Sequence, residues 1–427
     1  PYLSGKNNFW LFLLFFIGFG LKAGFIPLHT WLPEAHPAAP SHVSGIMSGV
    51  MIKMGIYGII RVIIQLSDSF MAIGVFLLII SLISTIMGLL FAIVQKDLKR
   101  ILAFSSIENI GIIGIGLSLG LIGFALKNNV LSILGYTGAL LHILNHAVLK
   151  SLLFFSAGSV YHATHTRNIE NLGGLIKHIP QTAFFFLIGI IGLSGLPPLN
   201  GFISEYIMYL GMFKSLPDSN LIISVLLLTS IILLTFTGGL AFFCFSRVFG
   251  VVFLGQKRSD SKHEIKECSS SMRNTMLFGS ILAIGIGLFP LLFVKPVCKT
   301  VGLVFNLEYT DVFRGQLLEN LKIIGSFGFF IVLVTSGLLY LRFRRQKLVE
   351  TSEHVTWGCG YTNGDAKHQY TGSSFSENLS WLAKPVLGIR KKTKTFEENE
   401  IFPESKTFYI QSVDFIKVKV LDPLVIR

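Results

Sequence analysis

The fold is decided by a stretch near the start of the chain, FWLFLLFFIGFGLKAGFIPL at residues 9–28. A membrane-spanning helix needs about 20 mostly apolar residues, and this stretch is long enough. It carries one charge, Lys22, well inside the apolar run. A lysine at the centre of a membrane helix costs about 2.5–3.5 kcal/mol on insertion scales, so Lys22 is predicted to face a polar interior rather than lipid.

The rest of the chain repeats this apolar character. Of 427 residues, 52% are hydrophobic and 14% are charged, so the lipid bilayer is the expected solvent. The apolar runs lack the short alternation of membrane strands, which predicts an all-α polytopic integral membrane helix bundle over residues 1–341. About nine segments have the required length, near 9–28, 42–66, 70–95, 101–125, 131–160, 180–213, 221–254, 274–294 and 319–341.

The charges between these segments predict the topology. The formal net charge is +13, but the basic residues lie in short loops, so they are interpreted as topology signals and no nucleic-acid partner is expected. Loops after the odd-numbered helices are the more basic, which predicts a cytoplasmic position for them and for the polar tail 342–427. The tail is expected to lie on the membrane surface or against a partner.

Two features limit what the chain is expected to contain. Its four cysteines show no CxxC or CxxCH spacing, so no cofactor is expected in this chain. It opens at Pro1 and enters an apolar run without a signal peptide, and we therefore expect a fragment of a longer protein.

One predicted helix is interrupted, at residues 194–201, SGLPPLNG. Pro197 and Pro198 remove backbone donors and clash with the preceding turn, which predicts a discontinuous helix. Interruptions of this kind inside a membrane usually line a buried or hydrated cavity. An ordinary loop between two short helices is the alternative. In the tail, the alternating stretch 408–420 is compatible with a short strand or with an amphipathic surface helix.

Ionisable side chains recur inside other predicted spans. Lys53 lies inside the second, and the fifth carries His142, His146 and Lys150 at i, i+4 and i+8, on one helix face. Glu205 follows the Pro-Pro break. Burying three lysines costs roughly 8–10 kcal/mol, so a polar axis through the bundle is predicted. Lys, His and Glu joined by water would form a proton wire.

Several of these residues also have a plainer interpretation. A single intramembrane His is often a hydrogen-bonded core residue, and Glu108 and His29 would serve equally well as caps or interfacial groups. A buried Lys, by contrast, has no cheap structural use. A metal site at His142 and His146 would lack a third ligand, and Lys150 would repel the cation.

Long stretches around these residues resemble the antiporter-like, proton-translocating membrane subunits of complex I and related complexes. The resemblance covers most of residues 20–250. It is carried by KAGFIPLHTWLPEAHPAAPSHVSG (22–45), SGVMIKMGIYG (48–58), VQKDLKRILAFSSIENIGIIGIG (94–116), LLHILNHAVLKSLLFFSAGSV (140–160) and GLSGLPPLNGFISEY (192–206).

Within that family, the tail motif WGCGYTNGDAKHQYTGSSFSE (357–377) is most similar to the membrane subunits of the formate hydrogenlyase and hydrogenase 4 (component B) type. The resemblance implies a prokaryotic inner membrane, other membrane subunits, and peripheral iron–sulfur and nickel–iron hydrogenase subunits as partners. It also implies that a glutamate on an earlier helix pairs with Lys22, and it assigns the pathway positions to Lys22, Lys53, His142, His146, Lys150 and Glu205.

Three functions follow as hypotheses. The first is a proton-translocating (alternatively sodium-translocating) subunit that carries out no bond chemistry and is driven by redox work elsewhere in a complex. The second is a stand-alone cation/proton antiporter subunit. The third is a structural membrane anchor for a peripheral hydrogenase. The retained Lys, His and Glu residues favour transport over anchoring.

Overall fold

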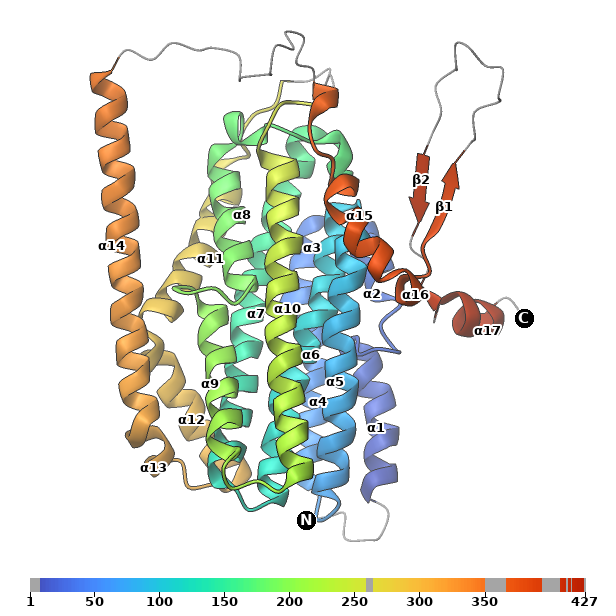
Figure 1. The fold of residues 1–427 in the computed structure, drawn as a ribbon, viewed down its shortest axis with the longest axis vertical. Coiled ribbons are helices and arrows are strands. Elements are labelled where there is room, and N and C mark those ends of the chain that lie inside the picture. The colour runs from blue at the N-terminus through green and yellow to red at the C-terminus, as the bar shows by residue number, and fades with distance from the viewer. Residues whose placement is uncertain are drawn as a thin grey trace.

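A computed structural model describes residues 8–258, 264–349, 366–393, 408–411, 414–415 and 417–425. It shows long, nearly parallel helices with a smaller tail at one side (Figure 1). The main helices are α1 (Asn8–Ala23), α2 (Leu32–Ala38), α3 (Ser41–Ile46), α4 (Ile52–Gln65), α5 (Phe70–Val94), α6 (Leu98–Ala125), α7 (Asn129–Thr164), α8 (Pro180–Leu193), α9 (Asn200–Ser215), α10 (Leu221–Phe253), α11 (Ser270–Leu288), α12 (Pro290–Phe305), α13 (Thr310–Val312) and α14 (Leu318–Leu348).

The predicted multi-pass helical fold is confirmed. Among the described residues, seven helical stretches are long and apolar enough to cross a membrane, and α1 and α8 are shorter apolar helices. The second predicted span is continuous from Ser41 to Gln65 because a π-helical turn, Met47–Met51, joins α3 to α4. The last span reaches Leu348, so the basic cluster 342–347, expected in the tail, forms the end of α14.

The predicted break at residues 194–201 separates α8 from α9, which stack end to end (Figure 1). The first helix is broken as well, which the sequence analysis did not anticipate. α1 ends at Ala23 and α2 begins at Leu32. Lys22 therefore occupies the last turn of a helix rather than the middle of one.

The two breaks share a five-residue pattern, GFIPL at 24–28 and GLPPL at 195–199. Each begins with a glycine in the left-handed region, Gly24 at φ 88° and Gly195 at φ 65°, and each contains a cis X-Pro bond. Glycine is the residue that adopts positive φ without steric cost. The two broken helices are thus built from the same local device.

A third interruption also departs from expectation. The segment 274–294, predicted as one span, is divided at Phe289, where α11 ends and α12 begins with Pro290. Phe289 has non-helical backbone angles (φ −116°, ψ 55°). Proline is tolerated in the first turn of a helix but not in its interior, so Pro290 starts a new helix.

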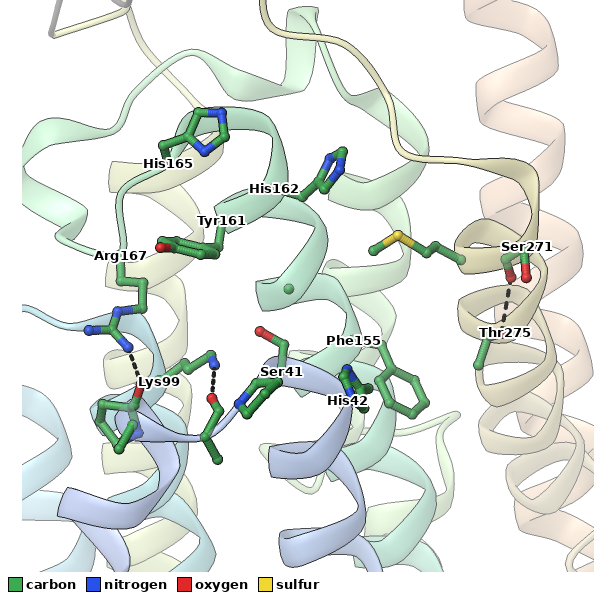
Figure 2. Close-up of a pocket in the computed structure, with 16 residues that line it drawn as sticks. Ser41, His42, Lys99, Phe155, Tyr161, His162, His165, Arg167, Ser271 and Thr275 are labelled. Atoms are coloured by element: carbon green, nitrogen blue, oxygen red, sulfur yellow. Dashed lines mark hydrogen bonds between the residues drawn. The ribbon is translucent and has the colours of Figure 1, made fainter.

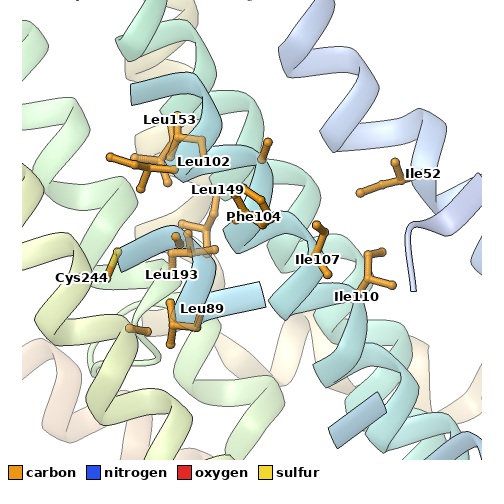
Figure 3. Close-up of a cluster of buried hydrophobic side chains, with 14 of the residues drawn as sticks. Ile52, Leu89, Leu102, Phe104, Ile107, Ile110, Leu149, Leu153, Leu193 and Cys244 are labelled. Atoms are coloured by element: carbon orange, nitrogen blue, oxygen red, sulfur yellow. The ribbon is translucent and has the colours of Figure 1, made fainter. Parts of the chain in front are cut away.

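The core is organised around α6, which is buried along nearly its whole length. Its side chains pack with those of α4, α5, α7, α8 and α10 in the cluster of Figure 3. α6 and α7 approach closely, since a Cβ on Gly135 would lie 2.6 Å from the backbone nitrogen of Gly120. Small residues permit such contact in membranes, where packing rather than the hydrophobic effect holds helices together.

A buried arginine fixes the end of one core helix. Arg247 of α10 is 2% exposed and donates hydrogen bonds to Ile93 O and, at 2.7 Å, to Gln95 O. These carbonyls lie at the carboxyl end of α5, where backbone acceptors have no partner within the helix and a cation is favoured. Arg247 was not singled out from the sequence.

The described part of the tail forms short elements beside the loop face of the bundle (Figure 1). They are α15 (Gly372–Leu382), α16 (Lys384–Leu387), the antiparallel strands β1 (Arg390–Thr393) and β2 (Phe408–Gln411), and α17 (Asp422–Val425). The stretch 408–420 thus contains a strand, and a π-helical turn begins at Lys417. Residues 357–361 of the tail motif and Cys359 lie outside the described residues.

One carboxylate connects the tail motif to the bundle. Glu170, in the loop between α7 and α8, accepts hydrogen bonds from the backbone nitrogens of Gly372 (3.1 Å) and Ser373 (2.8 Å) and from Ser373 Oγ (2.6 Å). These donors lie at the first turn of α15, where an anion is stabilised by the helix dipole. Arg258 lies 4.0 Å from the same carboxylate.

Glu170→Ala is expected to release α15 from the bundle, because its first turn loses three acceptor contacts worth about 1–3 kcal/mol together. Backbone amides of residues 372–382 should then exchange with deuterium roughly tenfold faster or more. Glu264→Ala is the matched control, since the ion-pair partner of Glu264 in the described ranges is the exposed Lys266. Unchanged exchange in Glu170→Ala would contradict this anchoring role.

Candidate functional site: a buried polar axis

Lys53 lies on α4 just after the π-helical turn Met47–Met51. Its side chain is 8% exposed, and Nζ donates to the backbone oxygen of Ser48, five residues earlier. A π turn widens the helix, and some of its backbone carbonyls are then free to accept hydrogen bonds from side chains. Such turns are frequent at functional sites. Gly49 in this turn permits close approach to α7, because a Cβ there would collide with Ser151.

Lys150 on α7 is completely buried. Its Nζ donates to Leu102 O at 3.0 Å and to Ser105 Oγ, both on α6. An isolated buried cation would cost several kcal/mol, and hydrogen bonds to backbone and hydroxyl oxygens offset part of that cost. The first turns of α6 therefore provide the polar surroundings of Lys150.

Two hydroxyl groups lie between the two lysines. Ser48 gives its backbone oxygen to Lys53, and its hydroxyl lies 2.7 Å from Ser106 Oγ. Ser106 Oγ donates to Leu102 O at 3.0 Å, the same oxygen that Lys150 contacts. Lys53 and Lys150 therefore belong to one buried polar cluster, in which both amines donate to backbone oxygens.

The set continues along α6 toward His142. Asn109 Nδ2 donates to the backbone oxygen of Ser105 at 2.8 Å, and Asn109 Oδ1 accepts from His142 Nε2 at 3.1 Å. Asn109 Nδ2 also lies 3.3 Å from Glu108 Oε2, and Glu108 is 1% exposed. One amide therefore contacts a buried carboxyl group and an imidazole.

The other ring nitrogen of His142 faces Ser204 on α9, with Nδ1 and Oγ 2.9 Å apart. Ser204 Oγ also lies 2.9 Å from Gly201 O, to which it can donate. When His142 is neutral, the hydroxyl proton can point to Nδ1. When His142 is charged, Nδ1–H can donate to the hydroxyl, whose proton then points to Gly201 O. A single hydroxyl rotation accommodates both protonation states.

Beyond Ser204 the hydrogen bonds reach the break between α8 and α9. Asn145 Nδ2 donates to Ser204 Oγ at 3.0 Å and to Asn200 O at 2.7 Å. Asn200 is the first residue of α9, and its side-chain nitrogen Nδ2 donates to Asn145 Oδ1 at 3.3 Å. Asn145 and Asn200 therefore hold α7 against the start of the half-helix that carries Glu205.

Glu205 lies at the break itself. The residue is 9% exposed, and a Cβ on Gly195 would lie 2.7 Å from its Oε2. Glycine at this position leaves the space that the carboxyl group occupies. The described residues include no ion-pair partner for Glu205.

The remaining predicted residues differ in their surroundings. His146 is completely buried, its ring is stacked on His142 with centroids 6.4 Å apart, and neither ring nitrogen has a hydrogen-bond partner in the described part of the chain. His29 is also buried, in the loop after α1, with Nε2 3.3 Å from Asp414 Oδ2 of the tail. Lys22 is exposed and has no ion pair among the described residues.

The structure thus brings Lys53, His142, His146, Lys150 and Glu205 into the interior of the bundle, while Lys22 lies on its surface. Among the described residues, no group of three or more His, Cys, Asp or Glu side chains is arranged to hold a metal ion.

Comparison with known proteins agrees with this architecture. The family model described as "NADH:quinone oxidoreductase/Mrp antiporter, TM" matches residues 2–235. The chain belongs to this family. It is an integral, multi-pass membrane protein of the antiporter-like type.

Two curated relatives extend the similarity. Hydrogenase-4 component B of Escherichia coli (strain K12) is 36% identical over 82% of this chain and 54% of its own length. Formate hydrogenlyase subunit 3 of the same organism is 34% identical over 89% of this chain and 61% of its own length. The chain therefore spans little more than half the length of these relatives.

A solved structure shares the fold. Respiratory complex I from Thermus thermophilus with bound NADH contains a chain that is 25% identical and superposes with a TM-score of 0.57, over 71% of this chain and 60% of that one. The resemblance to complex I and hydrogenase-type membrane subunits, inferred from sequence motifs, is confirmed at the level of the family.

Sequence reasoning missed the uncharged members of the axis. Ser105 and Asn109 lie in the SSIEN motif at 105–109, which was used only as a family resemblance. Ser48, Asn145 and Ser204 were not singled out. The available signal was the presence of polar residues in helices that are otherwise apolar on all sides. Such a helix has no side in contact with water, so each of its polar groups must form a hydrogen bond within the protein.

The hydroxyl of Ser204 gives a test of this network. Ser204→Ala leaves His142 Nδ1 without its partner, and the expected loss is about 1–3 kcal/mol of stability. A lower thermal unfolding midpoint of the purified membrane assembly would report it. Ser194→Ala is the control, because within the described part of the chain the Ser194 hydroxyl hydrogen-bonds only to Ile190 O of its own helix. Equal midpoints for the two variants would contradict the proposed coupling.

Proposed function

We propose that this chain is the proton-translocating membrane subunit of a hydrogenase- or NADH dehydrogenase-like oxidoreductase complex. The observation that carries the proposal is the row of buried, hydrogen-bonded polar groups that extends from Lys53 past Lys150 and His142 to Asn200, beside Glu205. A purely structural anchor would not require this set of titratable groups, because each buried ionisable group costs free energy.

Protons move in this proposal by exchange between neighbouring groups. The hydroxyls of Ser48 and Ser106 lie between Lys53 and Lys150. Both amines donate to backbone oxygens there, so water is required to complete this part of the route. At His142, rotation of the Ser204 hydroxyl accommodates the gain or loss of the Nδ1 proton. Redox work elsewhere in the complex changes the populations of the two states of this axis rather than supplying a bond-making step here. Glu205 at the helix break is the proposed group at the far end.

Four residues have less direct roles in the proposed proton route: Lys22, Glu108, His29 and His146. Lys22 extends the axis only if an acidic group on a neighbouring helix pairs with it, as the family resemblance implies. Water molecules are required to connect His146, whose ring nitrogens have no described hydrogen-bond partner. Glu108 is a candidate for proton exchange with the axis. His29 is a candidate for proton exchange at the end of the bundle where the basic loops lie.

Location and partners follow from relatives that are named as components of hydrogenase-4 and of formate hydrogenlyase. We propose the prokaryotic inner membrane, a cytoplasmic tail, and contacts with other membrane subunits. Peripheral iron–sulfur and nickel–iron hydrogenase subunits would supply the redox reaction. The loops after α5, α7 and α10, which carry many of the basic residues, emerge on the same side as the end of α14 (Figure 1), as expected for the cytoplasmic face.

Lys150→Ala is expected to lower donor-dependent proton transport by about a hundredfold or more, the typical loss when a positioned acid–base group is removed. The measurement is the pH change inside vesicles that contain the complete complex. Lys214→Ala, an exposed lysine near the end of α9, is the control and should transport normally.

The same assay separates the other functions. Cation-gradient-driven proton exchange without an electron donor would replace the proposal by a stand-alone cation/proton antiporter. Absence of proton movement in the intact complex would favour a structural anchor. Full transport by Lys150→Ala would contradict the proposed path.

A further inference from the structure

A cavity of about 800 Å³ lies at the end of the bundle that carries the basic loops after α5, α7 and α10, which we call the basic loop face (Figure 2). Four membrane-spanning helices begin or end beside it. α3 begins there at Ser41, α6 at Leu98 and α11 at Ser270, and α7 ends there at Thr164. Its walls include Lys99, Phe155, Tyr161, Arg167, Ser271 and Met272.

Both charged side chains of this lining, Lys99 and Arg167, are basic. Lys99, Arg167 and three histidines contribute to the walls, and the lining includes no Asp or Glu. Arg167 is partly balanced by Asp97, behind the wall, at 3.2 Å. The cavity therefore has an excess of positive charge.

Lys99 is the decisive residue because it is both charged and 4% exposed. Its Nζ donates to Ala39 O at 2.7 Å, and no carboxylate lies within ion-pair distance of it among the described residues. A buried cation without an anion is destabilising, whereas a paired and hydrogen-bonded one is tolerated. The site is thus arranged to gain from an added anion.

The opposite wall is apolar. Phe155 of α7 and Met272 of α11 contribute to the cavity wall from two helices, and the lining also includes the hydroxyl-bearing residues Tyr161 and Ser271. Figure 2 shows Phe155 deeper in the bundle than His162 and His165. A ligand that fits would carry a compact anionic group with several acceptor oxygens and an attached apolar chain.

We propose that this cavity binds the phosphate group of an anionic phospholipid, with the start of an acyl chain along Phe155 and Met272. Basic pockets between transmembrane helices on the cytoplasmic side are recognised sites for such headgroups. Lys99 neutralises the phosphate. Inorganic phosphate shares the anionic chemistry, but it leaves the apolar wall unused.

The test uses the complete membrane assembly with a phosphatidylglycerol that carries a photoreactive group near the top of its acyl chain. Crosslinks are expected on peptides that contain Phe155 or Met272, and the same probe built on phosphatidylcholine should label them about tenfold less. Lys99→Gln should reduce phosphatidylglycerol labelling about tenfold, the effect of losing one charged hydrogen bond. Its amide can still donate to Ala39 O.

Lys96→Gln is the matched control, with the same change in charge three residues away and outside the lining; its labelling should be unchanged. If Lys99→Gln does not assemble, Met272→Trp, which narrows the apolar wall without changing charge, should reduce labelling of the Phe155 peptide. Equal labelling by both lipids, equal loss in Lys99→Gln and Lys96→Gln, or undiminished labelling in Met272→Trp would overturn the proposal. Protection by inorganic phosphate as strong as that by phosphatidylglycerol would overturn the assignment to lipid.

Discussion

The buried amine of Lys150 is the constraint on which the interior of this protein depends. At this depth such a group must find oxygen atoms in the protein or in buried water, because the hydrocarbon core of the bilayer offers none. α6 supplies them through Leu102 O and Ser105 Oγ, and the same stretch of α6 contacts Ser48 through Ser106 and His142 through Asn109. The polar axis is therefore a property of α6 as much as of the ionisable residues.

Helix breaks serve the same requirement. At both GFIPL and GLPPL a left-handed glycine and a proline stop a helix within the bundle, and irregular backbone is tolerated at that depth only where protein or water satisfies it. At the second break, Asn145 of α7 pairs with Asn200 at the start of α9, and Glu205 fills the space beside Gly195. The end of the hydrogen-bonded path and the interruption of the helix coincide for this reason.

The loop face shows a second use of charge. Arg247 completes the carboxyl end of α5, Glu170 holds the first turn of α15, and Lys99 remains without an acidic partner among the described residues. In the first two cases a helix terminus supplies the opposite partial charge. At Lys99 the protein supplies the carbonyl of Ala39 and an adjacent cavity. Lys99 therefore belongs to a binding surface, whereas Arg247 and Glu170 make structural contacts.

By itself the sequence determined the fold class, the approximate spans, the break before Glu205 and the interior placement of Lys53, Lys150 and the two histidines, because a charge or a Pro-Pro pair inside an apolar run leaves few alternatives. It did not reveal the breaks after Ala23 and at Phe289, since a single proline is compatible with a helix start, a kink or a loop. Only the tertiary structure decided which hydroxyls and amides connect the charges, and that Lys22 lies at the surface. Hydrogen bonds between α4, α6, α7 and α9 depend on helix rotation and packing, which the periodicity of one helix does not contain.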